Sequence, residues 1–257
     1  MLAITLDSYF LMRRALREAT RQWGVELQNI FIPLFFLAVT VGAIGEISSE
    51  AFGVENFTGF QLPVAILQAT ASVSIGAGMG TITDIQSGYF DKLLLTPANR
   101  AAIVLGRIGS DAVRGALLTG LIVIVGLVIG SGMESGVLGA IALVIGGGLF
   151  SMAYSGLNVS LAIRTGSPQA AQAGFLLFFP LLFLSPAFAP KEIFAPWLEF
   201  LATINPVTYV LEAMRSLVLD GWVLEDLLYG LIAIGGIGVF SWTLTFLALR
   251  WRTAGGR

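Results

Sequence analysis

Six hydrophobic stretches dominate this sequence, and each is close to the ~20 residues that an α-helix needs to cross a bilayer. They lie at about 29–45, 59–83, 107–130, 137–160, 171–189 and 226–249. Hydrophobic residues make up 56% of the chain, and charged residues make up only 12%. Because this much apolar surface cannot be buried in one soluble core, we predict an all-α membrane protein with six transmembrane helices.

The first 28 residues are polar and basic but have a helical pattern. At about 100° per residue, one face gathers apolar side chains and another gathers arginines. The apolar face consists of Tyr9, Met12, Leu16, Ala19 and Trp23. We therefore predict an interfacial helix over residues 1–28 and a transmembrane domain over 29–257. The alternative is an ordinary surface helix. Arg14 and Glu18, four residues apart, are expected to form an ion pair.

The distribution of charge predicts how the chain crosses the membrane. If the N-terminus faces the cytoplasm, only Lys191 and Arg215 among the 14 basic residues fall on the outer side. The predicted outer segments are instead rich in Asp and Glu. Cytoplasmic loops of membrane proteins carry an excess of Lys and Arg. We therefore expect both termini, and the polar stretch 84–107, to face the cytoplasm.

The stretch 84–107 is the longest polar interruption between two hydrophobic segments near the middle of the chain. Residues 89–95 fit a short amphipathic helix that ends before Pro97, because proline disfavours a helical residue just ahead of it. Thr96 and Pro97 then form a helix start, with threonine as the cap and proline at the first position. The physical pattern suits either a simple membrane-surface loop or a docking element for a cytosolic partner.

The residues of this stretch carry a resemblance to a known family. The matching positions are Gly88, Phe90, Asp91, Lys92, Leu93, Thr96, Pro97, Arg100, Gly106 and Arg107. Their spacing resembles the cytoplasmic loop of ABC-2-type transporter permeases, especially the daunorubicin-resistance drug-export type. In that family the loop holds the coupling helix that sits on the ATPase subunit. The resemblance implies that contact for Gly88, Tyr89, Phe90, Asp91, Lys92, Leu93, Leu94, Thr96, Pro97 and Arg100.

A second informative stretch precedes the last predicted span. Asn205 and Pro206 predict a helix start, and Asp220-Gly221 predicts its end. Glu212 and Arg215 are expected to form an ion pair. The run Pro196, Trp197, Leu198, Leu201, Asn205, Pro206, Thr208, Tyr209 and Arg215 resembles the extracellular helical hairpin of the same family. The resemblance implies short re-entrant helices, with Asn205, Pro206, Tyr209, Glu212 and Arg215 in the hairpin.

Several features lie inside the predicted spans. Ser72, Gly76 and Gly80, spaced by four residues, predict a close approach of helix backbones. Arg107, Asp111 and Arg114 lie one turn apart near a membrane face, so a structural role in pairing is expected. The segment 171–189 contains Pro180, which should kink it, and five phenylalanines. Phe175, Phe178, Phe179 and Phe183 suit either a substrate pathway or contact with lipid.

The residues that are absent limit the chemistry. The chain has neither cysteine nor histidine and no Gly-x-x-x-x-Gly-Lys-[Ser/Thr] sequence, so we expect no catalytic site, metal site or cofactor of its own. The resemblance implies a partner ATPase subunit that binds ATP and magnesium, and a second permease copy, either identical or a sister chain. It further implies a place among the lipids of a bacterial cytoplasmic membrane, without nucleic acid.

The resemblance thus implies the membrane subunit of an ATP-driven exporter of a hydrophobic or amphipathic substrate, such as a drug-like molecule or a lipid. An ion-coupled secondary carrier is a different class of function. Such carriers place ionisable groups near the membrane midplane, and no carboxylate lies near the centre of a predicted span. A membrane scaffold without transport is a third class, which the sequence does not exclude.

Overall fold

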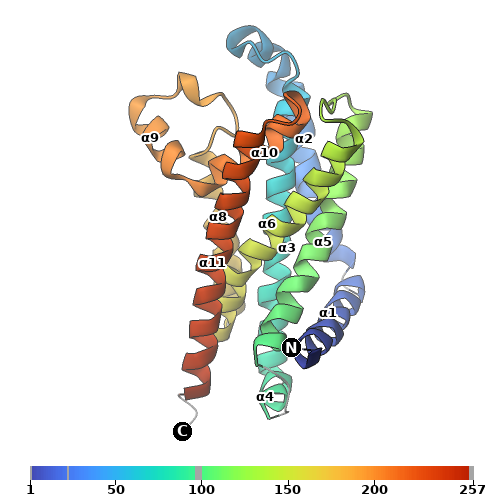
Figure 1. Ribbon diagram of the computed structural model, residues 1–257, viewed down its shortest axis with the longest axis vertical. Coiled ribbons are helices and arrows are strands. Elements are labelled where there is room, and N and C mark those ends of the chain that lie inside the picture. Colours follow the sequence, from blue (N-terminus) through green and yellow to red (C-terminus); the bar gives the residue numbers. More distant parts are fainter. Residues whose placement is uncertain (1, 22, 96–99, 255–257) are drawn as a thin grey trace.

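The computed structural model describes residues 2–21, 23–95 and 100–254, which form a bundle of helices without β-strands (Figure 1). The elements are α1 Leu2–Arg21, α2 Trp23–Phe52, α3 Phe57–Gln86, α4 Tyr89–Leu94, α5 Arg100–Val128, α6 Gly136–Thr165, α7 Pro168–Leu176, α8 Phe178–Phe183, η1 Lys191–Ile193, α9 Pro196–Ile204, α10 Pro206–Leu219 and α11 Leu224–Ala254. The prediction of an all-α membrane protein is confirmed.

Five helices of the described residues are long and apolar enough to cross a membrane. The membrane-crossing ranges are Trp23–Ser48, Phe57–Gln86, Ala101–Val128, Gly136–Thr165 and Leu224–Arg252. They correspond to five of the six predicted spans. The first begins at Trp23 rather than at 29, because residues 23–28 continue in α2.

The sixth predicted span, 171–189, does not form one long helix. Its residues fall in α7 and α8, which are interrupted at Leu177, and in turns and bends after Phe183. The physical reason is Pro180, which has no N–H to donate to the carbonyl of Leu176 four residues earlier. The expected kink is therefore a break, and it lies just before the proline.

Helix α3 is the centre of the bundle. Within its most apolar window 78% of residues are buried, against 17% for α2 and 22% for α11. Leu67 of α3 belongs to a fully buried core with Phe150 of α6, Phe178 of α8 and Leu211 of α10. Helices α2 and α11 lie at the periphery, and many of their apolar side chains are exposed.

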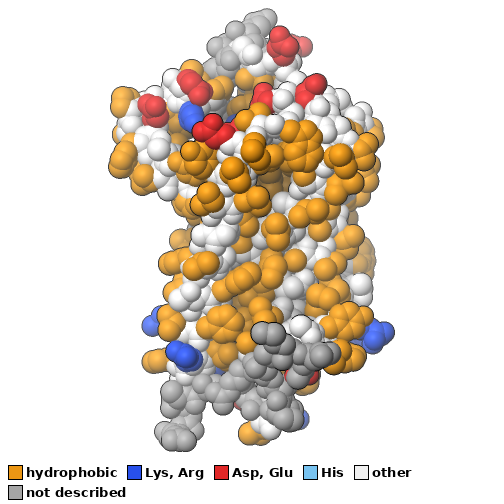
Figure 2. Space-filling model, in the orientation of Figure 1, with side chains coloured by type: hydrophobic (Ala, Val, Ile, Leu, Met, Phe, Trp, Pro, Cys, Tyr) orange, Lys and Arg blue, Asp and Glu red, His pale blue; other side chains and the backbone are white. Residues whose placement is uncertain are grey.

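The two ends of the bundle differ in their elements and in their charge. Helix α4, the C-terminal end of α11 and the start of α1 lie at one end, whereas α9 and α10 lie at the other (Figure 1). Acidic side chains gather at the α9–α10 end, and apolar side chains cover the middle of the visible face (Figure 2). The acidic side chains of the predicted outer segments therefore gather at one end of the bundle.

Helix α1 packs along α5. Gly106 permits this approach, because a Cβ there would meet the Cβ of Leu11 at 2.6 Å. Ala15 is buried in the contact, whereas Tyr9 of the predicted apolar face is exposed. The expected pair between Arg14 and Glu18 is wrong. Each binds another helix instead, because both side chains face the bundle.

Candidate functional site

Helix α4 matches the predicted helix over 89–95 closely. Gly88 links it to α3 with a φ of +70°, a left-handed conformation that glycine adopts without steric cost. The carbonyl of Gly88 then accepts a hydrogen bond from the N–H of Lys92, which closes the first turn. Thr96 and Pro97 lie outside the described residues, as do the side chains of Leu94 and Arg100.

One side of α4 is buried against the bundle and the other is exposed. Phe90 is only 3% exposed and packs in an apolar cluster with Ile103 of α5 and Leu249 of α11. Asp91 and Lys92 are exposed, and Leu95 just beyond the helix is 88% exposed. The buried phenylalanine fixes α4 to the bundle, while the exposed side presents two opposite charges and a leucine.

Two arginines that are far apart in the sequence, one in α1 and one in α11, contact α4. The guanidinium of Arg14 lies 3.9 Å from the ring centroid of Tyr89. The guanidinium of Arg252 lies 5.6 Å from the ring centroid of Phe90 and 3.9 Å from the carboxylate of Asp91. Both are within the range of cation–π attraction. Helix α4 therefore contacts the first and the last helix of the described chain.

Arg14 also belongs to a network of ion pairs behind α4. It binds Asp84 of α3 at 2.6 Å, and Arg107 of α5 lies 3.7 Å from the same carboxylate. Arg107 also binds Glu18 of α1 at 3.0 Å. The sequence pattern missed these pairs, because the partners lie on separate helices. The only feature of the sequence that indicated such pairs is the presence of isolated charged residues within apolar segments.

A second group of charges lies further along α5. Arg114 binds Asp111 at 2.9 Å, and it binds Glu26 of α2 at 2.5 Å. The expected structural pairing of Asp111 and Arg114 is thereby confirmed. In the described residues this group connects α2 to α5, as the first group connects α1 and α3 to α5.

The small-residue stripe of α3 has a different role from the predicted one. A Cβ on Gly80 would lie 1.0 Å from Nη2 of Arg107, and a Cβ on Gly76 would lie 2.8 Å from the guanidinium of Arg114. These two glycines therefore make room for arginine side chains, not for a helix backbone. Close backbone approach occurs elsewhere, where a Cβ on Gly148 of α6 would meet the carbonyl oxygen of Ala112 at 2.8 Å.

At the opposite end, the predicted start of α10 is confirmed. The side-chain oxygen of Asn205 accepts a hydrogen bond from the N–H of Val207 at 3.0 Å, and Pro206 occupies the first helical position. The amide of Asn205 also donates to the carbonyl of Leu181 at 2.5 Å. Tyr209 donates to the carbonyl of Thr203 at 2.6 Å, which connects α10 to α9.

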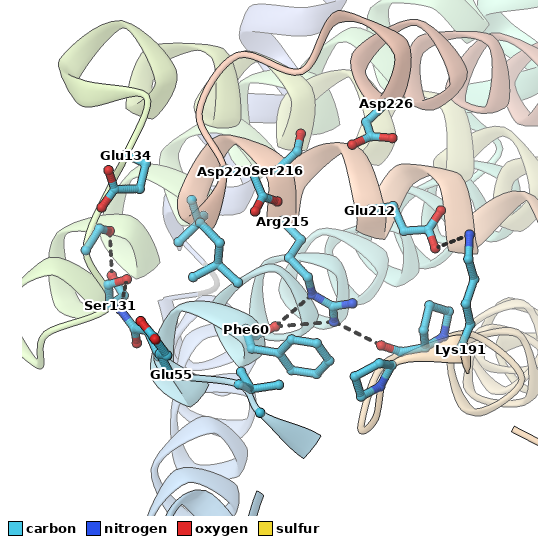
Figure 3. A pocket seen from close by; sticks show the side chains of 18 of the residues that line it. Glu55, Phe60, Ser131, Glu134, Lys191, Glu212, Arg215, Ser216, Asp220 and Asp226 are labelled. Carbon is cyan, nitrogen blue, oxygen red and sulfur yellow. Dashed lines mark hydrogen bonds and ion pairs between the residues drawn. The ribbon is translucent and has the colours of Figure 1, made fainter. Parts of the chain in front are cut away.

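The expected pair between Glu212 and Arg215 is wrong (Figure 3). Glu212 binds Lys191 at 3.3 Å and raises the pKa of that lysine. Arg215 donates to the carbonyls of Phe60 and Pro186 and lies 3.5 Å from the ring centroid of Phe60. The two residues lie on the same helix but face different elements, so Arg215 joins α10 to the start of α3.

These residues line a cavity of about 670 Å³ at the same end. Its wall also carries the acidic side chains Glu55, Glu134, Glu192, Asp220 and Asp226, several of which are visible in Figure 3. The cavity is polar and open, which distinguishes it from the apolar middle of the bundle.

The four phenylalanines of the predicted pathway do not form one surface. Phe178 is completely buried, with Phe150 and Tyr154 of α6 as neighbours. Phe175 contacts Phe179 at a centroid distance of 5.1 Å. Phe183 is 56% exposed and stacks near Phe188 instead. Their role in a substrate pathway stays a prediction.

The sequence was compared with known families and proteins. The family model "ABC-2 type transporter" matches residues 8–219. The daunorubicin resistance ABC transporter permease protein DrrB1 of Streptomyces coeruleorubidus is 26% identical over 201 residues, which are 77% of this chain and 70% of the relative. The probable doxorubicin resistance ABC transporter permease protein DrrC of Mycobacterium tuberculosis is 22% identical over 228 residues, which are 88% of this chain and 82% of the relative.

A third relative comes from an alga. The putative transport permease ycf38 of Cyanophora paradoxa is 24% identical over 214 residues, which are 82% of this chain and 73% of the relative. The family match includes α4, the ion-pair network and all of α10. With its helical bundle and its long apolar helices, the chain belongs to the ABC-2 type transporter family, and its relatives include a permease named for daunorubicin resistance.

Proposed function

We propose that this chain is the membrane subunit of an ATP-driven exporter, and that α4 receives the motion of a separate ATPase subunit. The observation that carries the proposal is the form of α4. It is a short helix anchored by buried Phe90, with Asp91 and Lys92 exposed at one end of the bundle. In this proposal ATP and magnesium bind to the partner and not to this chain.

The same proposal assigns sides to the bundle. The end with α4 faces the cytoplasm, and the acidic end with α9 and α10 faces outward, in line with the excess of basic residues near α4. Helix α1 then lies along the inner membrane surface as an elbow, followed by one transmembrane domain. Helices α9 and α10 form the outer hairpin, which re-enters the membrane. Asn205 caps the start of α10, and Arg215 joins α10 to α3.

Helices α7 and α8 supply the sixth crossing in this proposal. Residues 168–183 extend for about 24 Å at the usual helical rise, less than the ~30 Å hydrocarbon core. A broken helix of this length suits a span whose outer part is completed by the α9–α10 hairpin. Phe178 is completely buried in the core of the bundle, which supports a place for this segment among the membrane-spanning helices.

Transport requires a pathway, and we place it between two permease chains, either identical or sister chains. The exposed apolar faces of α2 and α11 leave room for such a partner and for lipid. The substrate class is hydrophobic or amphipathic. Support comes from the names of two relatives, which refer to daunorubicin and doxorubicin resistance.

The test of the coupling role is a reversal of the two exposed charges on α4. The double variant Asp91→Lys with Lys92→Glu should leave folding intact, because neither side chain is buried. The complex with its ATPase subunit should still hydrolyse ATP but should lose transport of an amphipathic fluorescent dye in proteoliposomes. The matched control is Glu134→Lys, an exposed charge reversal at the opposite end.

Normal transport per ATP in the double variant would remove the coupling role from α4. Purification from the native membrane in mild detergent tests the class of function separately. A stoichiometric ATPase subunit supports the exporter. A homo-oligomer without any ATPase would instead favour the carrier or the scaffold.

A further inference from the structure

A small cavity lies beside the ion-pair network, where α1, α2, α3 and α5 meet. Its volume is about 110 Å³. The charged side chains in its wall are Glu18, Glu26, Arg107, Asp111 and Arg114. Apolar residues lie beside them, among them Ala15, Ala19, Val25 and Met79. A cavity wall that carries both charged and apolar side chains suits the end of an amphipathic molecule.

The charges around the cavity do not cancel. The ion-paired groups of the two networks described above are Asp84, Glu18, Glu26, Asp111, Arg14, Arg107 and Arg114. Asp84 and Glu18 form ion pairs with Arg14 and Arg107, whereas Glu26 and Asp111 both form their ion pair with Arg114. One negative charge therefore remains uncompensated within this set, and it belongs to the pair of carboxylates around Arg114.

The structure of Asp111 locates this excess at one atom. Its side chain is 0% exposed, and its Oδ1 accepts a hydrogen bond from Arg114 at 2.9 Å. Its Oδ2 is buried without a hydrogen-bond partner among the described residues. A buried charged acceptor without a hydrogen-bond partner destabilises the folded chain. The site is therefore prepared for a ligand that donates hydrogen bonds and carries positive charge.

The arrangement selects the kind of cation. Among the described residues no group of three carboxylates is placed so that it could hold a metal ion. An ammonium group is different, because it brings three N–H donors and needs only one or two acceptors. The cavity has room for such a group but not for a whole drug-sized molecule. The remainder of the ligand would lie against the apolar residues of the cavity wall and extend into the membrane.

We infer that this cavity binds the ammonium group of an amphipathic amine, with Asp111 and Glu26 as the recognising carboxylates. Both residues line the cavity, and the side chain of Glu26 is 24% exposed whereas that of Asp111 is 0% exposed. If the exporter function proposed above holds, the amine is either a transported substrate or the headgroup of a resident aminolipid. Both sources share the same ammonium chemistry.

The test uses the complete complex in phosphatidylglycerol vesicles, which contain no amine lipid. Binding of dodecylammonium is measured and compared with dodecanol, which has the same chain length and no charge. We expect the amine to bind and the alcohol not to compete. Asp111→Asn removes the excess charge with little change of volume. It should weaken amine binding by roughly tenfold to a hundredfold, the range of a lost charge-assisted hydrogen bond.

The matched control is Glu134→Gln, at the opposite end of the bundle, which should leave amine binding unchanged. If Asp111→Asn does not fold, Glu26→Gln tests the same site at a partly exposed position and should also weaken binding. Equal binding of amine and alcohol by the unmodified complex overturns the inference. So does unchanged amine binding in the folded Asp111→Asn or Glu26→Gln variant.

Two further measurements separate the possible sources and the two proposals. If ATP drives the amine across the vesicle membrane, the amine is a substrate. If phosphatidylethanolamine displaces the bound amine, the site binds a lipid headgroup. Either result supports the site. Coupled transport of neutral substrates without amine binding overturns the site alone. Amine binding by a chain that has no ATPase partner overturns the exporter alone.

Discussion

Replacing Gly80 by alanine tests whether the position of Arg107 matters for stability. The new Cβ would lie 1.0 Å from Nη2 of Arg107. Since non-bonded heavy atoms separate by roughly 3.5 Å, the guanidinium must move by roughly 2.5 Å. It cannot then keep both the 3.0 Å contact with Glu18 and the 3.7 Å contact with Asp84. The question is whether the flexible side chain finds an equally good place.

Two opposing effects give the expected magnitude. The Arg107 side chain is 11% exposed, and disrupting a pair this buried costs about 3 kcal/mol. Alanine is a better helix former than glycine by about 1 kcal/mol, which acts in the other direction. We therefore expect a net loss of about 2 kcal/mol in the free energy of unfolding. The sign is the informative quantity.

The assay is reversible unfolding of the purified chain in mixed micelles, followed by circular dichroism. Gly235→Ala is the matched control, because a Cβ at Gly235 of α11 would meet nothing within 4 Å. The control should be neutral or stabilising by up to about 1 kcal/mol. In an Arg107→Ala background, Gly80→Ala should lose most of its cost. If Gly80→Ala behaves like Gly235→Ala in the unmodified chain, the reasoning about Arg107 is refuted.

Three further predictions concern other contacts. Arg252→Gln should lower the amount of substrate transported per ATP by at most about fivefold, because α4 loses one partly exposed ion pair. An unchanged amount per ATP would contradict a role of Arg252 in coupling. Asn205→Ala should lower the free energy of unfolding by about 2 kcal/mol through loss of the helix cap, measured by unfolding in micelles. Glu212 raises the pKa of Lys191 above 10.5, so the stabilisation by this ion pair should be complete below pH 10.5 and lost as pH rises through the raised pKa. The variant Lys191→Gln lacks the pair, so its free energy of unfolding should differ from that of the unmodified chain only below the raised pKa. A difference between the two that persists in strong base would contradict the assignment.

The parts of the structure that depend on neighbouring residues could be predicted from the sequence. The bounds of α4 and the start of α10 follow from Gly88, Asn205 and Pro206, which act through the backbone within a few residues. The five long membrane-spanning helices likewise follow from local hydrophobicity. The break at Leu177 was misplaced by a few residues, because the effect of Pro180 acts one helical turn before it.

The charged contacts could not be predicted, because their partners are far apart in the chain. Arg14 and Asp84 are 70 positions apart, and Arg107 and Glu18 are 89 apart. Spacing favours Glu212 with Arg215, but the tertiary contacts pair Glu212 with Lys191. Gly80 has a spacing that favours helix contact, and only the structure reveals the arginine that fills the space.

The two-sided support of α4 has a consequence for biosynthesis. Arg14 is made before α4, but Arg252 is among the last residues of the described chain to leave the ribosome. During synthesis α4 therefore emerges long before its second support exists. A nascent permease with an unfinished last helix presents α4 held on one side only. The contacts of Arg252 with Phe90 and Asp91 therefore form only after the end of α11 has been made.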